Sequence, residues 1–412
     1  MFVPVELHAP VLHWSVSAEQ SGAGPATHEP EEHLSSTVHP LPSETVTLDQ
    51  ANNRVVCRDI CAITDQPAFA QSAMDGFAFA ESTPARCLIT ATVAAGDSVH
   101  TQVKTGEAIR ILTGGMIPSG THAIARQEDC EVDGGFVSLR STSPLEAGRF
   151  IRAQGEVFNA GDIVLTAGSA TTPGAMALLA SAGVSIIEVH GRATALYLVT
   201  GDEIVPAGTP LLPGQTYNSN GPMMRAFFDD AKVGCRAISL GDNANTLQEI
   251  VTTANDSVVL LSGGSGPGDH DHTTTALENA GFTIHANRIN SRPGKPLIFA
   301  TRGPQIAFGL PGNPLAHWVC FHAFVRRAID RLHGIAPRNL IPATLIERID
   351  DVGDGRRTWT PARMDWSSGA LNVHPLPWKH SGDLTPLRTA DALILDGLRG
   401  DGTTVRILPI RS

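Results

Sequence analysis

Acidic residues recur in this sequence directly after short apolar runs. Such runs precede TGDE (200–203), GD (241–242) and the loop SGGSGPGDHDH (262–272), which carries Asp269 and Asp271. Carboxylates that meet in one place repel each other, by about 4 kcal/mol for two unit charges 4 Å apart at an effective dielectric near 20. A cluster of these residues would therefore indicate a bound divalent cation, typically Mg²⁺, or a carboxyl that keeps its proton.

Two glycine-rich loops supply the opposite polarity. The loop at 262–272 and the loop LPGNP (310–314) each precede a segment with helical character. Backbone N–H groups at such a turn, together with the positive end of a helix, can hold an oxyanion. The candidate anion-binding residues are Ser262, Gly263, Gly264, Gly268, Pro311, Gly312, Asn313 and Pro314. With the acidic loops, they predict a site for a phosphorylated ligand bridged by a divalent cation.

The elements that must position these loops alternate between strand and helix. Apolar runs predict strands at 195–199, 236–240, 258–261 and 305–308, with helices at 221–231, from 246, at 272–280 and at 314–333. This rhythm indicates a parallel sheet covered by helices on both faces. In such sheets the ligand crevice lies outside the carboxyl ends of the strands, which is where the acidic and glycine-rich loops fall.

The rest of the chain reads as further domains, rich in short strands. We predict a multidomain α/β protein with β-rich domains on either side of the central sheet. The expected boundaries are a flexible leader at 1–43, a linking and dimerisation domain at 44–60 and 146–190, a β-rich domain at 61–145, the α/β domain at 191–335 and a C-terminal β domain at 336–412. Within the linking domain we expect a strand at 45–48 followed by a helix.

Composition excludes several classes of partner. Thirty basic residues against 41 acidic ones give a net charge of −11, which disfavours binding to nucleic acid or to anionic lipid. The six cysteines include no Cys-x-x-Cys pair, as is typical of thiols in a reducing cytoplasm. The N-terminus lacks a signal-peptide pattern, and no segment approaches the roughly 20 apolar residues of a membrane helix. We therefore expect a cytoplasmic protein.

Taken together, the motifs resemble those of the MoeA family, which includes the E domain of gephyrin. QSAMDGFAFA (71–80), RILTGGMIPSGTHAIARQED (110–129), TGDE, the Asp242 loop, SGGSGPGDHD, RPGKP (292–296) and LPGNP follow in the family's order. The resemblance runs from about Val46 to the C-terminus. Any one of these motifs is weak by itself, whereas their common order is specific.

The resemblance implies a fold, a reaction and an assembly. The family fold is an elongated homodimer whose cleft combines the α/β molybdopterin-binding domain of one subunit with the β-rich domain of the other. The implied enzyme is a Mg²⁺-dependent molybdopterin molybdenumtransferase, which takes adenylyl-molybdopterin and molybdate and yields molybdenum cofactor and AMP. Other enzymes of molybdenum cofactor synthesis are implied as partners.

The resemblance also implies roles for individual residues. Asp75 and Thr113 would come from the partner subunit, while Glu203, Asp242 and Asp271 would place Mg²⁺ and the pterin. Arg292 and Lys295 are candidates for binding phosphate or molybdate, since a lysine point charge suits an oxyanion. Pro311 and Pro314 would shape the molybdate loop.

Several positions depart from the family pattern. Val157 replaces an acidic residue, Pro267 removes an N–H from the glycine loop, Thr274 replaces a lysine, and Leu315-Ala316 replaces Val-Ser. Two alternatives therefore stay open: a molybdopterin adenylyltransferase, which has a smaller fold, and a non-catalytic MoeA-like scaffold. A transition-metal centre at DHDH is disfavoured, because alternating residues of an extended segment point to opposite sides.

Overall fold

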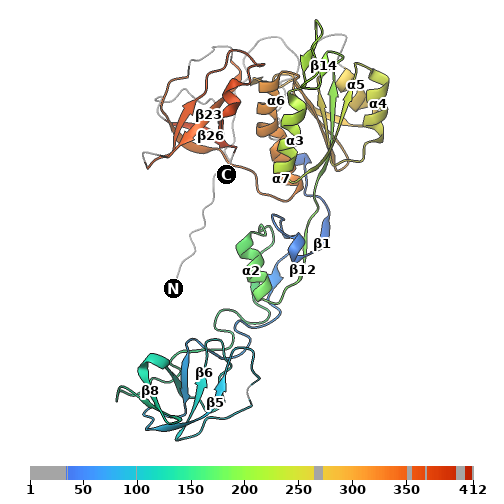
Figure 1. The fold of residues 1–412 in the computed structure, drawn as a ribbon. Helices are drawn as coiled ribbons and strands as arrows, with labels where there is room; N and C mark the ends of the chain where they lie inside the picture. The colour runs from blue at the N-terminus through green and yellow to red at the C-terminus, as the bar shows by residue number, and fades with distance from the viewer. Residues whose placement is uncertain are drawn as a thin grey trace.

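The computed structural model describes residues 34, 36–98, 100–263, 272–349, 355–366, 369–395 and 404–410. Figure 1 shows an elongated molecule in which a slender middle part joins a β-rich end to a larger end with an α/β sheet and a second β sheet. Among the helices that are described, none is both long and apolar enough to span a bilayer.

The α/β sheet has six strands in the order β16-β13-β17-β21-β20-β18. Their bounds are β13 (Thr194–Thr200), β16 (Gly234–Leu240), β17 (Val258–Ser262), β18 (Thr283–Asn287), β20 (Ile298–Arg302) and β21 (Gln305–Leu310). Strands β16, β13, β17 and β21 are parallel, as the sequence predicts. Strands β20 and β18 run antiparallel at one edge and were not predicted.

Helices cover both faces of this sheet because side chains along a strand alternate between its faces. Ala195, Tyr197 and Val199 of β13 pack into a core with α3 (Asn220–Asp230) and the long C-terminal helical run. Leu196 and Leu198 pack on the other face. The helices on that second face are α4 (Ala244–Thr253) and α5 (His272–Asn279).

The long helical run predicted at 314–333 is interrupted. It consists of α6 (Pro314–Cys320), a π-helical turn η3 (Phe321–Val325) and α7 (Arg326–Leu332). A second six-stranded sheet packs beside it, in the order β19-β23-β24-β22-β26-β25. Its strands are β19 (Ser291–Arg292), β22 (Ile341–Leu345), β23 (Arg357–Asp365), β24 (Asn372–Pro375), β25 (Ala392–Leu395) and β26 (Thr404–Pro409), with the 3-10 turn η4 (Thr385–Arg388).

The middle part contains a small apolar core around Val46, Val56 and Leu179. Its elements are β1 (Ser43–Thr47), β2 (Ile60–Cys61), β11 (Ile163–Leu165), α2 (Pro173–Ser181) and β12 (Ile186–His190). The helix expected after Leu48 is wrong, because only the 3-10 turn η1 (Leu48–Gln50) forms there. Asn53 takes a positive φ of 57°, and Val55 and Val56 form β-bridges with Ala170 and Val189, which helical residues could not do.

The β-rich end is a six-stranded sheet in the order β7-β4-β6-β5-β9-β8. Its strands are β4 (Gly76–Phe79), β5 (Cys87–Val93), β6 (Glu107–Ile111), β7 (Ala123–Arg126), β8 (Cys130–Asp133) and β9 (Phe136–Leu139), with the 3-10 turn η2 (Gln127–Asp129). A short pair, β3 (Gln71–Ser72) with β10 (Ile151–Arg152), connects this end to the middle part.

The expected flexible leader falls largely outside the described residues, which begin at Leu34. The part that is described, however, is packed against the larger end of the molecule. Leu34 and Val38 are 3% and 1% exposed within the main core. The Arg331 Nε donates to the Val38 carbonyl at 3.0 Å, and the Leu41 N–H donates to the Leu332 carbonyl at 2.8 Å. Leu34 and Val38, which fall within the predicted leader, therefore belong to the folded core.

Candidate active site

The carboxyl ends of the parallel strands lie side by side. Thr200 pairs with Leu240, Val199 with Ser262, and Ser262 with Leu310. The TGDE loop, the Gly241-Asp242 loop, the glycine loop at 262 and the LPGNP loop therefore leave the sheet at one edge. This arrangement confirms the geometric prediction from the strand and helix rhythm.

A cavity of about 250 Å³ opens at this edge, and both Glu203 and Asp242 line it. Two acidic residues 39 positions apart in the chain thus face one space, as predicted. The other lining residues are Thr200, Gly201, Gly241, Asn243, Ala244, Leu247, Gly263, His272 and Thr273. Asp271, the third predicted acidic residue, lies outside the described residues together with Asp269, Gly264, Pro267 and Gly268.

Asp202 connects the two acidic loops, a role that the sequence reasoning missed. Its Oδ1 accepts a hydrogen bond from the Asp242 N–H at 3.2 Å. A Cβ on Gly241 would come within 2.4 Å of that same oxygen, so only glycine leaves room for the bond. The sequence does contain a signal for Asp202: it is an acidic residue directly after a glycine, in the same TGDE loop as Glu203.

Threonine hydroxyls fix the beginning of the glycine loop. Thr200 Oγ1 donates to the Ser262 carbonyl at 3.1 Å, and Thr273 Oγ1 donates to the Gly263 carbonyl at 3.1 Å. Gly263 has a φ of 97°, a conformation that favours glycine. Nearby, Asn243 caps α4 by accepting from the Thr246 N–H at 3.0 Å. The cavity wall is thus held by side chains from the end of β13, from α5 and from the residue that caps α4.

The donor set suits a hard cation in type, although it is not a complete metal cage. Carboxylate oxygens are the ligands that Mg²⁺ prefers, and Mg²⁺ commonly uses one or two of them beside substrate phosphates and water. Within the described part of the chain, no three His, Cys, Asp or Glu side chains form a group that could hold a metal ion. Glu203 and Asp242 therefore fit a cation that a phosphorylated ligand helps to bind.

The LPGNP loop is clamped from three directions. His317 Nδ1 lies 2.9 Å from the Pro311 carbonyl, Asn220 Nδ2 donates to the Gly312 carbonyl at 2.8 Å, and Asn313 Nδ2 donates to Ser381 Oγ at 2.8 Å. Gly312 and Asn313 remain exposed beyond these anchors. Pro314 begins α6, where its missing N–H costs nothing.

His317 is fully buried, and its tautomer follows from its partners. Burial lowers the pKa of His317 to about 4, so the ring is neutral. A carbonyl can only accept, so Nδ1 carries the proton and Nε2 accepts from the Tyr197 hydroxyl at 3.4 Å. Tyr197, His317 and the Pro311 carbonyl are therefore joined by hydrogen bonds between neutral groups, and no ion pair is involved.

The RPGKP segment lies between the two sheets of the larger end. Arg292 belongs to β19, which pairs with β23, and its guanidinium carbon lies 5.6 Å from the centre of the Trp378 ring. Gly294 has a φ of 113°, and a Cβ there would lie 2.7 Å from Cys320 Sγ. Lys295 is exposed. Both cations are thus outside the lining of the acidic cavity.

Asp75 and Thr113 form a unit of their own in the β-rich end. Asp75 Oδ1 accepts from the Thr113 N–H at 2.7 Å and from Thr113 Oγ1 at 2.8 Å. These hydrogen bonds hold the pKa of Asp75 below its usual range. Figure 1 places the β-rich end at the opposite end of the molecule from the α/β sheet. Within one chain, therefore, Asp75 and Thr113 are not brought to the cavity.

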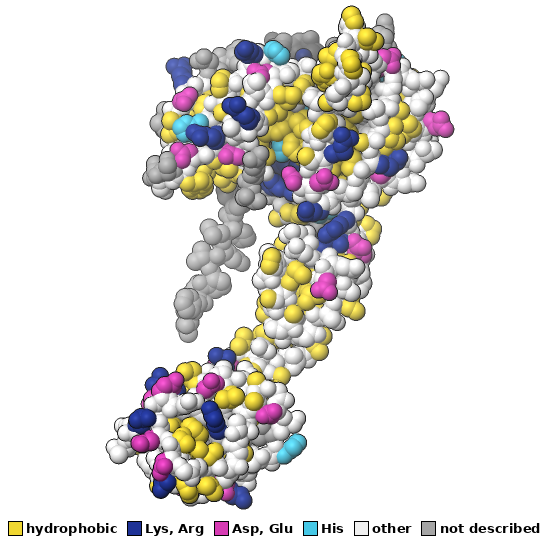
Figure 2. Space-filling model, viewed as in Figure 1, with side chains coloured by type: hydrophobic (Ala, Val, Ile, Leu, Met, Phe, Trp, Pro, Cys, Tyr) yellow, Lys and Arg dark blue, Asp and Glu magenta, His cyan; other side chains and the backbone are white. Residues whose placement is uncertain are grey.

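An apolar arm leaves the sheet next to Glu203. It consists of β14 (Ile204–Val205), β15 (Thr216–Tyr217) and the loop between them, in which Leu211 and Leu212 are 45% and 65% exposed. Figure 2 shows this arm as a mainly hydrophobic protrusion at the top of the molecule. Exposed apolar surface of this kind is typical of a contact surface for a ligand or another chain.

The positions that depart from the family pattern take unremarkable local roles. Val157 is 70% exposed, and its N–H donates to the Gln66 carbonyl at 2.9 Å. Thr274 Oγ1 accepts from Asn287 Nδ2 at 3.3 Å. Ala316 is buried in the first turn of α6. None of these three residues lines the acidic cavity.

Comparisons with known proteins agree with the geometry. A family model described as "MoeA N-terminal region (domain I and II)" matches residues 27–183, and one described as "Probable molybdopterin binding domain" matches residues 197–331. The chain is 31% identical over 371 residues to the molybdopterin molybdenumtransferase of Nostoc sp., covering 85% of this chain and 84% of the relative. It is 34% identical over 306 residues to the molybdopterin molybdenumtransferase of Haemophilus influenzae, covering 72% of this chain and 74% of the relative.

A solved structure shares the fold along nearly the whole chain. The crystal structure of the molybdopterin biosynthesis moeA protein from Pyrococcus horikoshii superposes with a TM-score of 0.76 at 24% identity, covering 94% of this chain and 100% of that chain. At this identity the likeness concerns the fold.

Proposed function

This chain belongs to the MoeA family, and on that premise we propose that it is a molybdopterin molybdenumtransferase acting in the cytoplasm. It inserts molybdate into adenylyl-molybdopterin, with release of AMP, and yields molybdenum cofactor. The observation that supports this most directly is the shared cavity of Glu203 and Asp242 at the carboxyl edge of the parallel sheet. In open α/β sheets, ligands bind in the crevice outside the carboxyl ends of the strands.

The reaction breaks the phosphoanhydride bond between AMP and the molybdopterin phosphate. An oxygen of molybdate attacks the phosphorus of the AMP moiety, and the departing molybdopterin phosphate keeps the electron pair of the broken P–O bond. The two dithiolene sulfurs then bond to molybdenum as its bond to the transferred oxygen breaks, so that oxygen stays on AMP. The cavity lining has two carboxylates and no lysine or arginine among the described residues, so it would repel a bare diphosphate. Glu203 and Asp242 would hold Mg²⁺, which supplies charge neutralisation at the diphosphate oxygens.

The remaining candidate residues supply positioning and positive charge. The clamped LPGNP loop offers Gly312 and Asn313 as a fixed rim for an oxyanion. Lys295 and Arg292 would bring cationic groups to phosphate or molybdate from the segment between the two sheets. A second copy of the chain would supply Asp75 and Thr113, which the first copy cannot bring to its own cavity.

The decisive experiment measures AMP released from adenylyl-molybdopterin with and without molybdate and Mg²⁺. We expect release to require both, and we expect Asp242→Asn to lower kcat by roughly 100-fold, because a charge at the diphosphate is lost. Glu249→Gln is the matched control, since Glu249 is an exposed acidic residue of α4 outside the cavity lining. Equal AMP release by Asp242→Asn and Glu249→Gln, or consumption of ATP instead of adenylyl-molybdopterin, would refute the proposal.

A further inference from the structure

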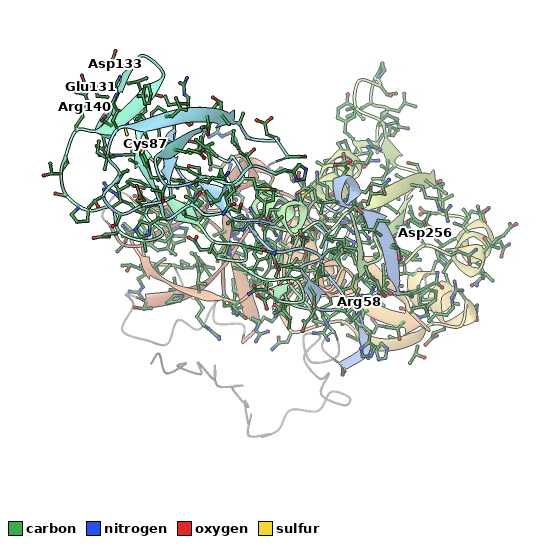
Figure 3. All side chains as sticks on the ribbon, turned by 90° about the horizontal axis from the view of Figure 1, so that it is seen from below. Arg58, Cys87, Glu131, Asp133, Arg140 and Asp256 are labelled. Atoms are coloured by element: carbon green, nitrogen blue, oxygen red, sulfur yellow. The ribbon has the colours of Figure 1, made fainter. Side chains whose placement is uncertain are left out.

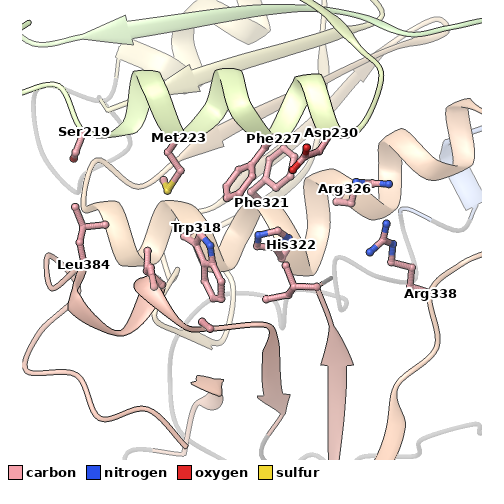
Figure 4. Close-up of a pocket in the computed structure, with 13 residues that line it drawn as sticks. Ser219, Met223, Phe227, Asp230, Trp318, Phe321, His322, Arg326, Arg338 and Leu384 are labelled. Atoms are coloured by element: carbon pink, nitrogen blue, oxygen red, sulfur yellow. The ribbon is translucent and has the colours of Figure 1, made fainter. Parts of the chain in front are cut away.

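A second and larger cavity, of about 800 Å³, lies between the α/β domain and the C-terminal sheet. Figure 4 shows it between α3, the α6–η3–α7 run and the C-terminal segment. Its lining includes Phe227, Trp318, Phe321, His322, Arg326 and Arg338. It shares no lining residue with the cavity of Glu203 and Asp242. The proposed reaction therefore does not account for it.

One wall of this cavity is aromatic and surrounds a histidine. Phe227 stacks on Phe321 with ring centres 4.6 Å apart, and the His322 ring stands edge-on to Phe227 at 4.7 Å and to Trp318 at 4.9 Å. His322 is 8% exposed, and no described residue lies within hydrogen-bond distance of its Nε2. That nitrogen has almost no accessible surface, so His322 contributes the surface of its ring to the cavity wall rather than a polar contact.

The backbone of this wall has an unusual conformation. Phe321 and His322 belong to the π-helical turn η3 that separates α6 from α7. Single π-helical turns inside a longer helix are rare and often occur at functional sites. Here the turn brings the rings of Phe321 and His322 onto the same cavity wall.

Two arginines lie at one end of the cavity (Figure 4). Asp330, which is 1% exposed, accepts from Arg326 Nε at 2.7 Å and from Arg338 Nε at 3.0 Å. One buried carboxylate between two guanidinium groups leaves a local charge of plus one. Asp230 of α3 also borders the cavity, but it is exposed to water. In the described part of the chain the Nη groups of Arg326 and Arg338 have no hydrogen-bond partner, so they can donate to an acidic ligand.

We propose that this cavity binds a small organic molecule that combines a planar ring system with one acidic oxygen group. The ring lies against Phe227 and Trp318, and the acidic group binds the Nη groups of Arg326 and Arg338. The volume falls in the range of roughly 300 to 1,000 Å³ that small-molecule sites occupy, commonly between domains. Aromatic walls with a few polar groups at one end are typical of such sites.

The test uses the full-length protein and the dye 8-anilinonaphthalene-1-sulfonate, which has planar rings and one acidic group. Calorimetry gives the stoichiometry, and dye fluorescence gives the affinity. We expect one dye per chain, with affinity lowered about tenfold in Arg338→Gln and in Phe227→Leu. Arg236→Gln is the control, since Arg236 is a half-exposed arginine ion-paired with Asp256 on the α/β sheet, outside this cavity. Its affinity should equal that of the wild type.

A displacement pair tests the chemical class of the ligand. Indole-3-acetate should displace the dye, whereas tryptamine, which has the same ring with a positive charge, should not. Unchanged dye affinity in both Arg338→Gln and Phe227→Leu, or displacement by tryptamine as readily as by indole-3-acetate, would overturn the proposal. AMP release should be the same in the wild type, Arg338→Gln and Arg236→Gln. If the wild-type protein binds the dye as expected but releases no AMP from adenylyl-molybdopterin, the proposed function is refuted and the proposal for this cavity stands.

Discussion

At the scale of single residues, the buried His317 makes the free energy of unfolding depend on pH. Burial lowers the pKa of His317 to about 4, against an ordinary value near 6.5. The unfolded chain therefore binds a proton below pH 6.5 that the folded chain does not take up until near pH 4. Since the unfolded state binds more protons in this window, the free energy of unfolding falls as the pH falls through it.

We predict that His317→Gln makes the stability of the larger end less dependent on pH. Between pH 7 and pH 5 the wild type should lose about 2 kcal/mol through His317 alone, and the variant should lose about that much less. Urea unfolding at pH 7 and pH 5 measures this by tryptophan fluorescence, since Trp318 and Trp359 are buried in the same core as His317's helix. The exposed His100 supplies the control, His100→Gln. Equal pH dependence in His317→Gln and the wild type would contradict the assignment of a neutral His317.

At the scale of elements, the sequence predicts the parallel strands well because each is a short buried apolar run followed by a loop with glycine. The convergence of Glu203 and Asp242 follows from that topology alone. The antiparallel strands β20 and β18 were missed. Only Gly303 and Pro304 separate β20 from β21, and so short a connection can join only antiparallel strands. From the sequence alone, Gly303 and Pro304 predict only a loop, and they do not show that the segments on either side pair with each other.

Other features of the site depend on contacts between distant segments. Asp202 joins the site through a hydrogen bond from the Asp242 N–H, and Ser381 joins it from a turn between β24 and β25. The π-helical turn η3 leaves no periodic signal, because Phe321–Val325 is apolar enough for an ordinary helix. These contacts and this turn cannot be predicted from local sequence propensity, because they depend on tertiary packing.

Strand pairing also explains the glycine of the SAMDG motif and leads to a second prediction. Gly76 of β4 pairs with Arg126 of β7, and a Cβ on Gly76 would lie 1.9 Å from the Ala125 carbonyl oxygen. Gly76→Ala must therefore push β4 and β7 apart, at a cost of about 3 kcal/mol. Because Asp75 precedes Gly76, the shift should also disturb its contact with Thr113.

Differential scanning calorimetry measures the effect on the β-rich end. Gly174→Ala is the control: Gly174 lies in α2, and a Cβ there would meet only Thr172 Oγ1 at 3.9 Å. Alanine in a helix is favoured over glycine by up to about 1 kcal/mol, so the control should unfold at the same temperature or higher. A wild-type transition temperature for Gly76→Ala would show that the strands adapt without cost.

At the scale of the whole molecule, the two halves of the candidate site lie far apart. The pair Asp75 and Thr113 is in the β-rich end, and the cavity of Glu203 and Asp242 is in the opposite end of the molecule. Figure 3, seen from below, labels Glu131 and Asp133 in the β-rich end and Asp256 in the α/β sheet, on opposite sides of the view. The slender middle part exposes large apolar side chains, with Ile63, Val157 and Ile186 at 68%, 70% and 59% exposure. Such a surface supports self-association. A second copy could then bring its Asp75 to the cavity of the first.

This arrangement predicts that two inactive variants restore activity when they are combined. Asp75→Ala and Glu203→Gln should each abolish most AMP release as separate dimers. In dimers refolded from an equal mixture, half should be hybrids, and each hybrid should hold one cavity with both Glu203 and Asp75 intact. The expected recovery is roughly a quarter of wild-type AMP release. If Asp75 acted on the cavity of its own chain, every cavity in the mixture would still lack one of the two carboxylates. No activity would then return, whereas mixing Glu203→Gln with Asp242→Asn should give no recovery under either arrangement, because those two residues share one cavity.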